Sequence, residues 1–275
     1  MISMVLATLG RKDELVLFLE CLSNQGTKDF EIIIVDQNED GYIDDIIVRF
    51  NKMYDIRHIK ITKKGLSVAR NIGLKYVKGD IVCFPDDDCY YGENSLLKVI
   101  NYFAANDLVD CLIIKALDFE RNLLTKEKYT SSINEQSLWN IGISIALFFK
   151  TDVINKVGMF DESLGVGSGT IYCSGEETDF LYRTKKVGYI AYCNDIEVFH
   201  PQKEDIINNA IIKRAYYYGC GCGRVLNKNK ASISMKYSCL LRPFLGTIVA
   251  LFQFNVLLAK KRWMTFLGRC RGLFC

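Results

Sequence analysis

Three adjacent carboxylates, at Asp86, Asp87 and Asp88, follow a short apolar run at residues 81–85. Carboxylates placed side by side repel one another, and a hard cation bound through oxygen ligands relieves that repulsion. A divalent ion held here could bridge the oxygens of a diphosphate and offset its negative charge as it leaves. Acidic triplets also occur in solvated loops, so the triplet alone has two interpretations.

A second acidic cluster, Glu176, Glu177 and Asp179, follows Ser174 and Gly175. A carboxylate in such a cluster can act as the general base that takes a proton from an attacking hydroxyl group. The same pattern can also begin a helix, because Ser174 and Glu177 have the spacing of a capping box. Acids in a first helical turn also complement the helix dipole.

His200 is one of two histidines and closes an apparent strand at residues 196–199, directly before Pro201. A neutral imidazole is a good ligand for a transition ion such as Mn²⁺ and a poorer one for Mg²⁺. A lone histidine can equally be a structural residue. His200 is therefore a candidate metal ligand with a structural alternative.

Short β-rich runs alternate with helical patterns over the first hundred residues. The expected strands are residues 2–7, 31–35, 57–62 and 80–85, and the expected helices are residues 13–23, 42–53 and 66–77. This βαβ alternation predicts an α/β fold with a mostly parallel sheet and helices on both faces. Ligands bind such sheets beyond the carboxyl ends of the strands. Asp36, which closes an all-apolar strand, and the acidic triplet both fall at such ends, although Asp36 can also be a plain turn residue.

Charge is divided unevenly along the chain. The whole sequence carries +3, but no Asp or Glu follows Asp205, and twelve of the 35 Lys and Arg lie in residues 206–275. The first 205 residues therefore hold 23 basic against 32 acidic groups. A basic tail on an acidic body is typical of contact with a polyanion, either a nucleic acid or an anionic membrane surface.

The tail also contains an uncharged run at residues 243–259, followed by three basic residues at 260–262. The run is shorter than the stretch of about 20 apolar residues that crosses a bilayer. An amphipathic helix that lies in the membrane plane, or a re-entrant one, is therefore favoured over a span. We expect residues 226–275 to bind an anionic membrane surface and expect no nucleic-acid partner.

The eleven cysteines form no regular framework, and no basic segment precedes the first apolar stretch. Both features indicate a reducing cytoplasm and no secretory signal peptide. We interpret the close pair Cys220 and Cys222 as packing or membrane-proximal thiols rather than as a zinc site. The expected location is cytoplasmic, peripheral on the inner face of the cell membrane.

Taken together, residues 1–225 resemble the family 2 glycosyltransferases. The resemblance rests on residues 7–11 for the opening signature, Asp36, residues 69–73 for an Ala-Arg-Asn-x-Gly stretch, Asp86 and Asp88 as the DXD motif, and the acidic segment at 175–179. It implies a GT-A nucleotide-diphospho-sugar transferase fold, to which the composition of the tail adds a C-terminal amphipathic helical segment. Residues 1–115 would form the nucleotide-sugar-binding half and residues 116–225 the acceptor and catalytic half.

The resemblance also implies roles for individual residues. Those it assigns to the donor are Thr8, Arg11, Asp36, Arg70, Asp86 and Asp87. Asp36 contacts a pyrimidine in such enzymes, and Asp86 faces the ribose and the water shell of the metal. Asp88, with His200, would bind Mn²⁺ or Mg²⁺.

The second half matches in order as well. Residues 140–149 resemble the strand before the catalytic centre, residues 157–162 resemble a Gly-x-Phe-Asp-Glu segment, and a flexible loop is expected at 165–169. The base in this family is an aspartate, and Glu177 stands in its place with a side chain one methylene longer. Glu176 and Asp179 are the alternative bases.

The implied enzyme is an inverting, metal-dependent glycosyltransferase of the hexosyltransferase type. Its base deprotonates an acceptor hydroxyl, which attacks the anomeric carbon of a nucleoside-diphosphate sugar. With the basic tail, this predicts a lipid-linked saccharide acceptor in cell-surface polysaccharide synthesis. One alternative is a sugar-1-phosphate nucleotidyltransferase, although only Gly10 remains of that class's glycine-rich loop. The other is a non-enzymatic protein that binds polyanions through its tail.

Overall fold

The computed structural model describes residues 1–125, 133–202 and 206–274. The described chain divides into two compact units. The first contains residues 1–64, 68–160 and 180–202, and the second contains residues 65–67, 161–179 and the C-terminal segment from 206 onward.

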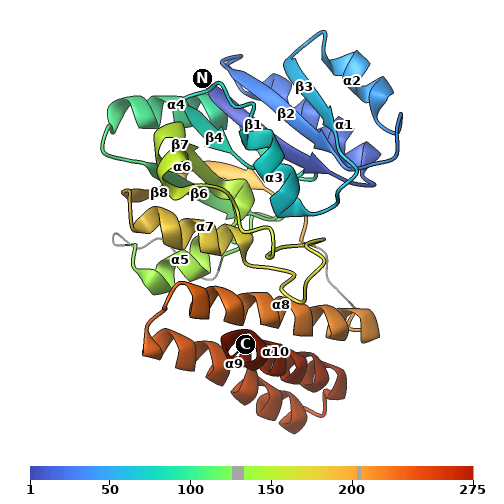
Figure 1. Cartoon of the computed structure of the whole chain (residues 1–275), viewed down its shortest axis with the longest axis vertical. Helices are drawn as coiled ribbons and strands as arrows, with labels where there is room; N and C mark the ends of the chain where they lie inside the picture. The colour runs from blue at the N-terminus through green and yellow to red at the C-terminus, as the bar shows by residue number, and fades with distance from the viewer. Residues whose placement is uncertain (126–132, 203–205, 275) are drawn as a thin grey trace. The chain divides into compact units, whose positions relative to one another are not determined.

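The first unit is built on one sheet. Its strands, in chain order, are β1 (Ile2–Thr8), β2 (Phe30–Asp36), β3 (Asp55–Lys60), β4 (Ile81–Cys83), β5 (Tyr90–Tyr91), β6 (Cys111–Leu117), β7 (Leu147–Lys150) and β8 (Ile190–Phe199). They lie in the order β3-β2-β1-β4-β7-β6-β8-β5 (Figure 1). The first four strands are parallel, whereas β7 is antiparallel to both β4 and β6. The predicted α/β fold is therefore confirmed, with a parallel first half and a mixed second half.

The helices that accompany this sheet are α1 (Lys12–Cys21), α2 (Asp44–Phe50), α3 (Leu66–Leu74), α4 (Ser95–Ala105), α5 (Glu135–Ile141), α6 (Thr151–Val157) and α7 (Glu176–Lys185). The first residues of α3 and α7 belong to the second unit. The four strands and three helices expected in the first hundred residues are all present. Their ends differ from the predicted ones by at most about three residues, as is usual for periodicity arguments.

One predicted strand is wrong over most of its length. Residues 140–149 were expected to be extended, but the chain is helical through Ile141 and forms a 3₁₀ turn at Ser144–Ala146 before β7. The helical part begins at a cap, because the side chain of Asn134 accepts a hydrogen bond of 2.9 Å from the backbone N–H of Ser137 and so starts α5.

The core of the first unit has an aliphatic and an aromatic part. The four residues of β2 directly before Asp36 are apolar and fully buried, as a central strand covered on both faces requires. The aromatic part brings together the rings of Phe84, Phe149, Phe160 and Phe180, with centroid separations between 4.4 and 6.3 Å. Phe84 directly follows β4, so this cluster supports the backbone from which the acidic triplet begins.

Three long helices dominate the second unit: α8 (Asn209–Lys228), α9 (Ile233–Phe252) and α10 (Val256–Phe274) (Figure 1). Glycines bring α8 and α10 into backbone contact. A Cβ atom at Gly219 would lie 2.7 Å from the carbonyl oxygen of Thr265, and one at Gly268 would collide with the carbonyl of Tyr216. Gly223 and Gly272 repeat the contact one turn later, a small-xxx-small arrangement on both helices.

Polar groups of α10 hold α9 in place. Arg262 Nη1 donates to the carbonyl of Gly246 at 2.9 Å, and Arg269 Nη1 donates to that of Cys239 at 2.5 Å. Cys222 of α8 lies with its Sγ atom 3.4 Å from Sγ of Cys239. Cys220 is buried where α8 packs against α10, so the thiols of both Cys220 and Cys222 pack inside this unit.

The uncharged run at residues 243–259 does not form one helix. It supplies the end of α9, a turn at 253–255 and the start of α10. Within the described residues, α9 is the one helix whose length and composition could cross a membrane, with mean hydropathy 1.2 over its most apolar window. The boundary predicted at 225–226 lies inside α8.

Candidate active site

The acidic triplet lies beyond the carboxyl end of β4, beside the end of β1. Thr8 Oγ1, on the last residue of β1, donates to Asp87 Oδ2 at 2.8 Å. Asp87 is buried, and burial raises the pKa of its carboxyl group to about 6 despite the hydrogen bond from Thr8 and the charge of Arg11. The middle carboxylate is thus directed toward the sheet edge.

Arg11 offsets the repulsion between Asp87 and Asp88. Its Nη1 atom donates to Asp87 Oδ1 at 3.0 Å and to Asp88 Oδ2 at 2.5 Å, and its side chain remains about half exposed. A half-exposed guanidinium between two carboxylates can also reach a bound anion, because it presents several N–H donors in a planar fork.

Asp86, Asp88 and His200 form the candidate metal site. One ligand atom from each lies within 4.8 Å of the others, and His200 Nε2 is 3.1 Å from Asp88 Oδ1. The pairing of Tyr90 with Phe199 at the end of β8 brings His200 to this place. Burial disfavours the ionised form of Asp88, but the hydrogen bond and charge of His200, together with Arg11, lower its pKa.

The chemistry of these donors fits a divalent transition ion. Two carboxylate oxygens and an imidazole nitrogen are ligands that Mn²⁺ accepts. Asp88 Oδ1 is buried and has His200 Nε2 at 3.1 Å as its ion-pair partner. A cation bound among these groups would take up lone pairs of the carboxylates that the protein leaves unused.

Asp36 is held by three hydrogen-bonding groups. Its Oδ1 atom accepts from the backbone N–H of Asn38 at 2.9 Å and from Asn38 Nδ2 at 2.8 Å, and its Oδ2 atom lies 2.9 Å from His58 Nε2. The carboxylate is almost fully buried and is paired in register with Thr8 of β1. The sequence analysis missed His58, whose proximity depends on the register of β3 against β2.

The geometry also explains the stretch at residues 69–73. The guanidinium of Arg70 is buried against the rings of Phe84 and Phe160, at 5.7 and 5.5 Å from their centroids, and lies 3.7 Å from Asp86 Oδ1. Asn71 donates to the carbonyl of Phe160 and accepts from its backbone N–H. A Cβ atom at Gly73 would collide with Val5 of β1. This stretch therefore joins α3 to the sheet while holding a cation beside the triplet.

These features coincide with a match to known sequences. Residues 3–158 match the family model described as Glycosyl transferase family 2. The chain belongs to this family. It is therefore a glycosyltransferase, and the alternatives of a nucleotidyltransferase and a non-enzymatic protein no longer apply.

Individual relatives agree with the family. The chain is 24% identical over 226 residues to the glycosyltransferase AglE of Haloferax volcanii, covering 79% of this chain and 70% of AglE. It is 33% identical over 105 residues to WfaP of Escherichia coli, a UDP-Glc:alpha-D-GlcNAc-diphosphoundecaprenol beta-1,3-glucosyltransferase, covering 37% of this chain and 41% of WfaP.

The fold agrees with a solved structure as well. The mannosyltransferase PcManGT of Pyrobaculum calidifontis, in complex with GDP-Man and Mn²⁺, superposes with a TM-score of 0.70 at 14% identity. The superposition covers 99% of this chain and 87% of PcManGT. The predicted GT-A fold is thereby confirmed.

The second acidic cluster of this glycosyltransferase begins α7, as the sequence indicated. Gly175, with φ of +90°, accepts the first helical hydrogen bond from the N–H of Asp179 at 2.8 Å. Glu176 is buried, whereas Glu177 is partly exposed. Ser174 Oγ donates to the carbonyl of Tyr218 on α8 at 2.9 Å, which ties the start of α7 to that helix.

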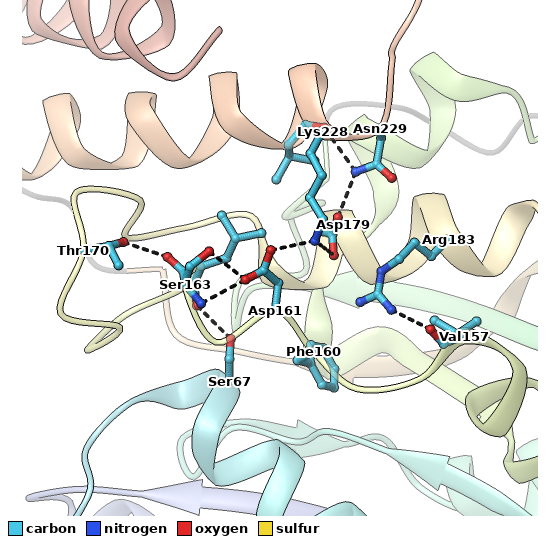
Figure 2. A network of polar contacts seen from close by, with 12 residues as sticks. Ser67, Val157, Phe160, Asp161, Ser163, Thr170, Asp179, Arg183, Lys228 and Asn229 are labelled. Carbon is cyan, nitrogen blue, oxygen red and sulfur yellow. Dashed lines mark hydrogen bonds and ion pairs between the residues drawn. The ribbon is translucent and has the colours of Figure 1, made fainter. Parts of the chain in front are cut away.

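Asp179 has partners that the sequence analysis did not identify. It is fully buried, and its carboxylate accepts hydrogen bonds from Asn229 Nδ2 at 2.9 Å and from Lys228 Nζ at 3.1 Å. Figure 2 shows Lys228 also reaching Asp161, whose Oδ2 atom lies 2.6 Å from Nζ. Lys228 and Asn229 follow Asp179 by about 50 residues, so no local sequence pattern could have shown this contact.

The predicted residues thus fall into two groups. Thr8, Arg11, Asp36, Arg70, the triplet and His200 belong to the first unit, where neighbouring members contact one another as described. Glu176, Glu177 and Asp179 belong to the second unit.

Proposed function

We propose that this glycosyltransferase moves a sugar, with inversion at the anomeric carbon, from a nucleoside-diphosphate donor to a hydroxyl group of a saccharide acceptor, and that the reaction requires a divalent metal. The cluster of Asp86, Asp88 and His200 at the carboxyl edge of the sheet is the observation that carries the proposal. The Mn²⁺ and GDP-Man named for the PcManGT complex support it.

Asp88 and His200 are the proposed metal ligands, with Asp86 beside the ribose and the water shell of the metal. A bound ion neutralises charge on the diphosphate leaving group. Arg11 and Arg70 contribute positive charge on either side of the triplet, and Asp87 holds Thr8 and Arg11 in position. Asp36 is the proposed acceptor for an N–H group of the donor base, oriented by Asn38 and His58.

Glu177 is the proposed general base. It matches the family's catalytic aspartate in position, and it is the one carboxylate of the cluster whose side chain is partly exposed. Glu176 is buried, and Asp179 is engaged by Lys228 and Asn229. These contacts support a structural role for Asp179, which would fix the first turn of α7 and thereby the direction of Glu177.

We further propose that the acceptor is a lipid-linked saccharide used in cell-surface polymer synthesis and that the enzyme works at the inner face of the cell membrane. The diphosphoundecaprenol acceptor in the name of WfaP supports this proposal. Residues 206–275 contain twelve basic residues and no Asp or Glu, which supports attraction to an anionic surface.

The test is metal-dependent hydrolysis and transfer with a panel of nucleotide sugars. The protein treated with a chelator should lose turnover and regain it with Mn²⁺. Asp88→Asn should not regain it, whereas Asp195→Asn, which alters an exposed acid on β8, should behave as wild type. A folded Asp88→Asn protein with wild-type, metal-dependent turnover would contradict the metal assignment.

A further inference from the structure

The outer side of α9 exposes apolar side chains along its whole length. Those at three- and four-residue spacing on this side are Tyr237, Leu241, Phe244, Ile248 and Phe252. The opposite side of α9 is buried within the second unit through Met235, Cys239, Pro243, Thr247 and Ala250. An apolar, exposed side along about four turns is far more than the scattered hydrophobic residues of an ordinary surface.

A groove opens in this side between α9 and α10. It has a volume of about 220 Å³ and is lined by Tyr237, Leu240, Leu241, Phe244 and Phe266. Trp263 lies next to it, with its ring 5.2 Å from that of Phe266 and 6.4 Å from that of Phe244. An apolar cavity of about 150 Å³ is enough to hold a benzene molecule. This groove therefore has room for a short stretch of hydrocarbon chain.

The charges around the groove have one sign. Lys236 and Arg242 adjoin the lining residues Tyr237 and Leu241 in sequence. At about 100° per residue, each lies about 120° around the helix from the centre of the exposed apolar side, Arg242 exposed and Lys236 partly buried. No acidic residue occurs after Asp205. The groove is thus apolar inside, and the charged residues next to its lining in sequence are basic.

We propose that this groove is a lipid site, in which a hydrocarbon chain of an anionic membrane lipid lies while Lys236 and Arg242 contact the head group. A second copy of the chain is a poorer occupant, because two such surfaces would bring basic groups together without any acid to pair with them. The proposal rests on the membrane association proposed above and not on the transfer reaction.

The turn between α9 and α10 fits the same orientation. Phe252 and Phe254 are 81% and 91% exposed, and Phe254 adopts a φ of +54° that non-glycine residues seldom take. The backbone of this turn thus holds a phenyl ring in solvent at the end of the apolar side. With one side of α9 buried in the unit, the helix would lie in the plane of the membrane, with the turn at the level of the acyl chains.

Trp263 provides a direct test, because Trp139 is the other tryptophan and can be replaced. In Trp139→Phe protein, fluorescence of Trp263 should be quenched by vesicles with brominated acyl chains when they contain phosphatidylglycerol, and much less by pure phosphatidylcholine vesicles. Replacing Lys236 and Arg242 by serine should remove that preference. Binding to anionic vesicles without quenching of Trp263 would overturn the proposal.

Two matched leucine variants distinguish binding at the groove from non-specific hydrophobic adsorption to vesicles. Leu241 and Leu108 are both exposed, but Leu108 lies in the first unit. Leu241→Ser should lower partitioning into anionic vesicles about tenfold, and Leu108→Ser should not change it. Equal partitioning of the two variants, or a lipid-free dimer that Leu241→Ser dissociates, would overturn the lipid site. Donor hydrolysis with Mn²⁺ is measured separately: wild-type protein that binds lipid but hydrolyses no nucleotide sugar counts against the proposed reaction alone.

Discussion

Aspartates in the two units are held in opposite ways. In the first unit, Asp86, Asp87 and Asp88 are crowded at a strand end, where burial raises the pKa of Asp87 to about 6. In the second unit, Lys228 stands between Asp161 and Asp179, and the pKa of Asp161 falls to about 2 despite its partial burial, because Lys228 and Ser163 bond to it. The first arrangement crowds three carboxylates beside Arg11 and Arg70, whereas the second places one lysine between two carboxylates.

The largest effect should come from Glu177, the proposed general base. Glu177→Gln should lower kcat by about 10² to 10⁴, the usual loss when a general base is removed, with donor affinity nearly unchanged. Steady-state kinetics and calorimetric titration of the donor would measure the two quantities. Normal transfer by Glu177→Gln, together with an inactive Glu176→Gln protein, would move the base to the neighbouring position.

Removing the ammonium group of Lys228 should lower the stability of the fold rather than the rate of transfer. Lys228→Met leaves the fully buried Asp179 without its ammonium partner, so the free energy of unfolding should fall by about 2–3 kcal/mol, less than for a fully buried pair because Lys228 is partly exposed. Urea denaturation measures this change, with the exposed Lys186→Met as the control. A loss below about 0.5 kcal/mol would mean that the other partners of Asp179, Asn229 among them, satisfy its carboxylate.

The two aspartate environments should respond to pH with opposite signs. Because the pKa of Asp87 is raised, the folded metal-free protein binds a proton that the unfolded chain releases between about pH 4 and pH 6, and stability should fall as the pH rises through that window. Because the pKa of Asp161 is lowered, its contribution is present above about pH 4 and is lost as the pH falls toward about 2.

Single variants assign the two pH windows. Asp87→Asn should flatten the stability profile between pH 4 and 6 by on the order of 2 kcal/mol, and Asp161→Asn should flatten it only below pH 4. Thermal denaturation of the metal-free protein across this range is the measurement. A profile between pH 4 and 6 that Asp87→Asn leaves unaltered would contradict the burial argument.

The smallest effect should come from His58, which acts on the nucleotide sugar only through its contact with Asp36. His58→Phe removes one partner of Asp36 and should raise the KM for the nucleotide sugar several-fold, about the value of one hydrogen bond, with little change in kcat. His58→Gln, which can still donate, should restore part of the loss. An equal fall in kcat for both variants would indicate a general disturbance of the sheet.

Local patterns predicted what depends on local structure. Apolar periodicity located the first four strands and three helices, and the pattern of acids placed the triplet at a strand end and Glu177 at a helix start. The contacts of Asp179 with Lys228 and Asn229, and of Asp36 with His58, depend on tertiary packing and strand register, which no spacing reveals. The error at residues 140–149 had a readable signal, because Asn134 is a favourable helix-capping residue. The uncharged run at 243–259 was treated as one segment because Gln253 and Asn255 carry no charge, yet the chain turns at these residues.

The glycine contacts of the second unit have a mechanical consequence. The backbones of α8 and α10 touch at Gly219, Gly223, Gly268 and Gly272. The two helices cannot slide past one another without a gap opening, so a displacement of α10 would move α8 with it. On another side of α8, Gly221 abuts the backbone of Ser174, two residues before α7 begins. If a bilayer held α9 and α10, it would therefore also fix the position of the first turn of α7, which carries the carboxylate of Glu177.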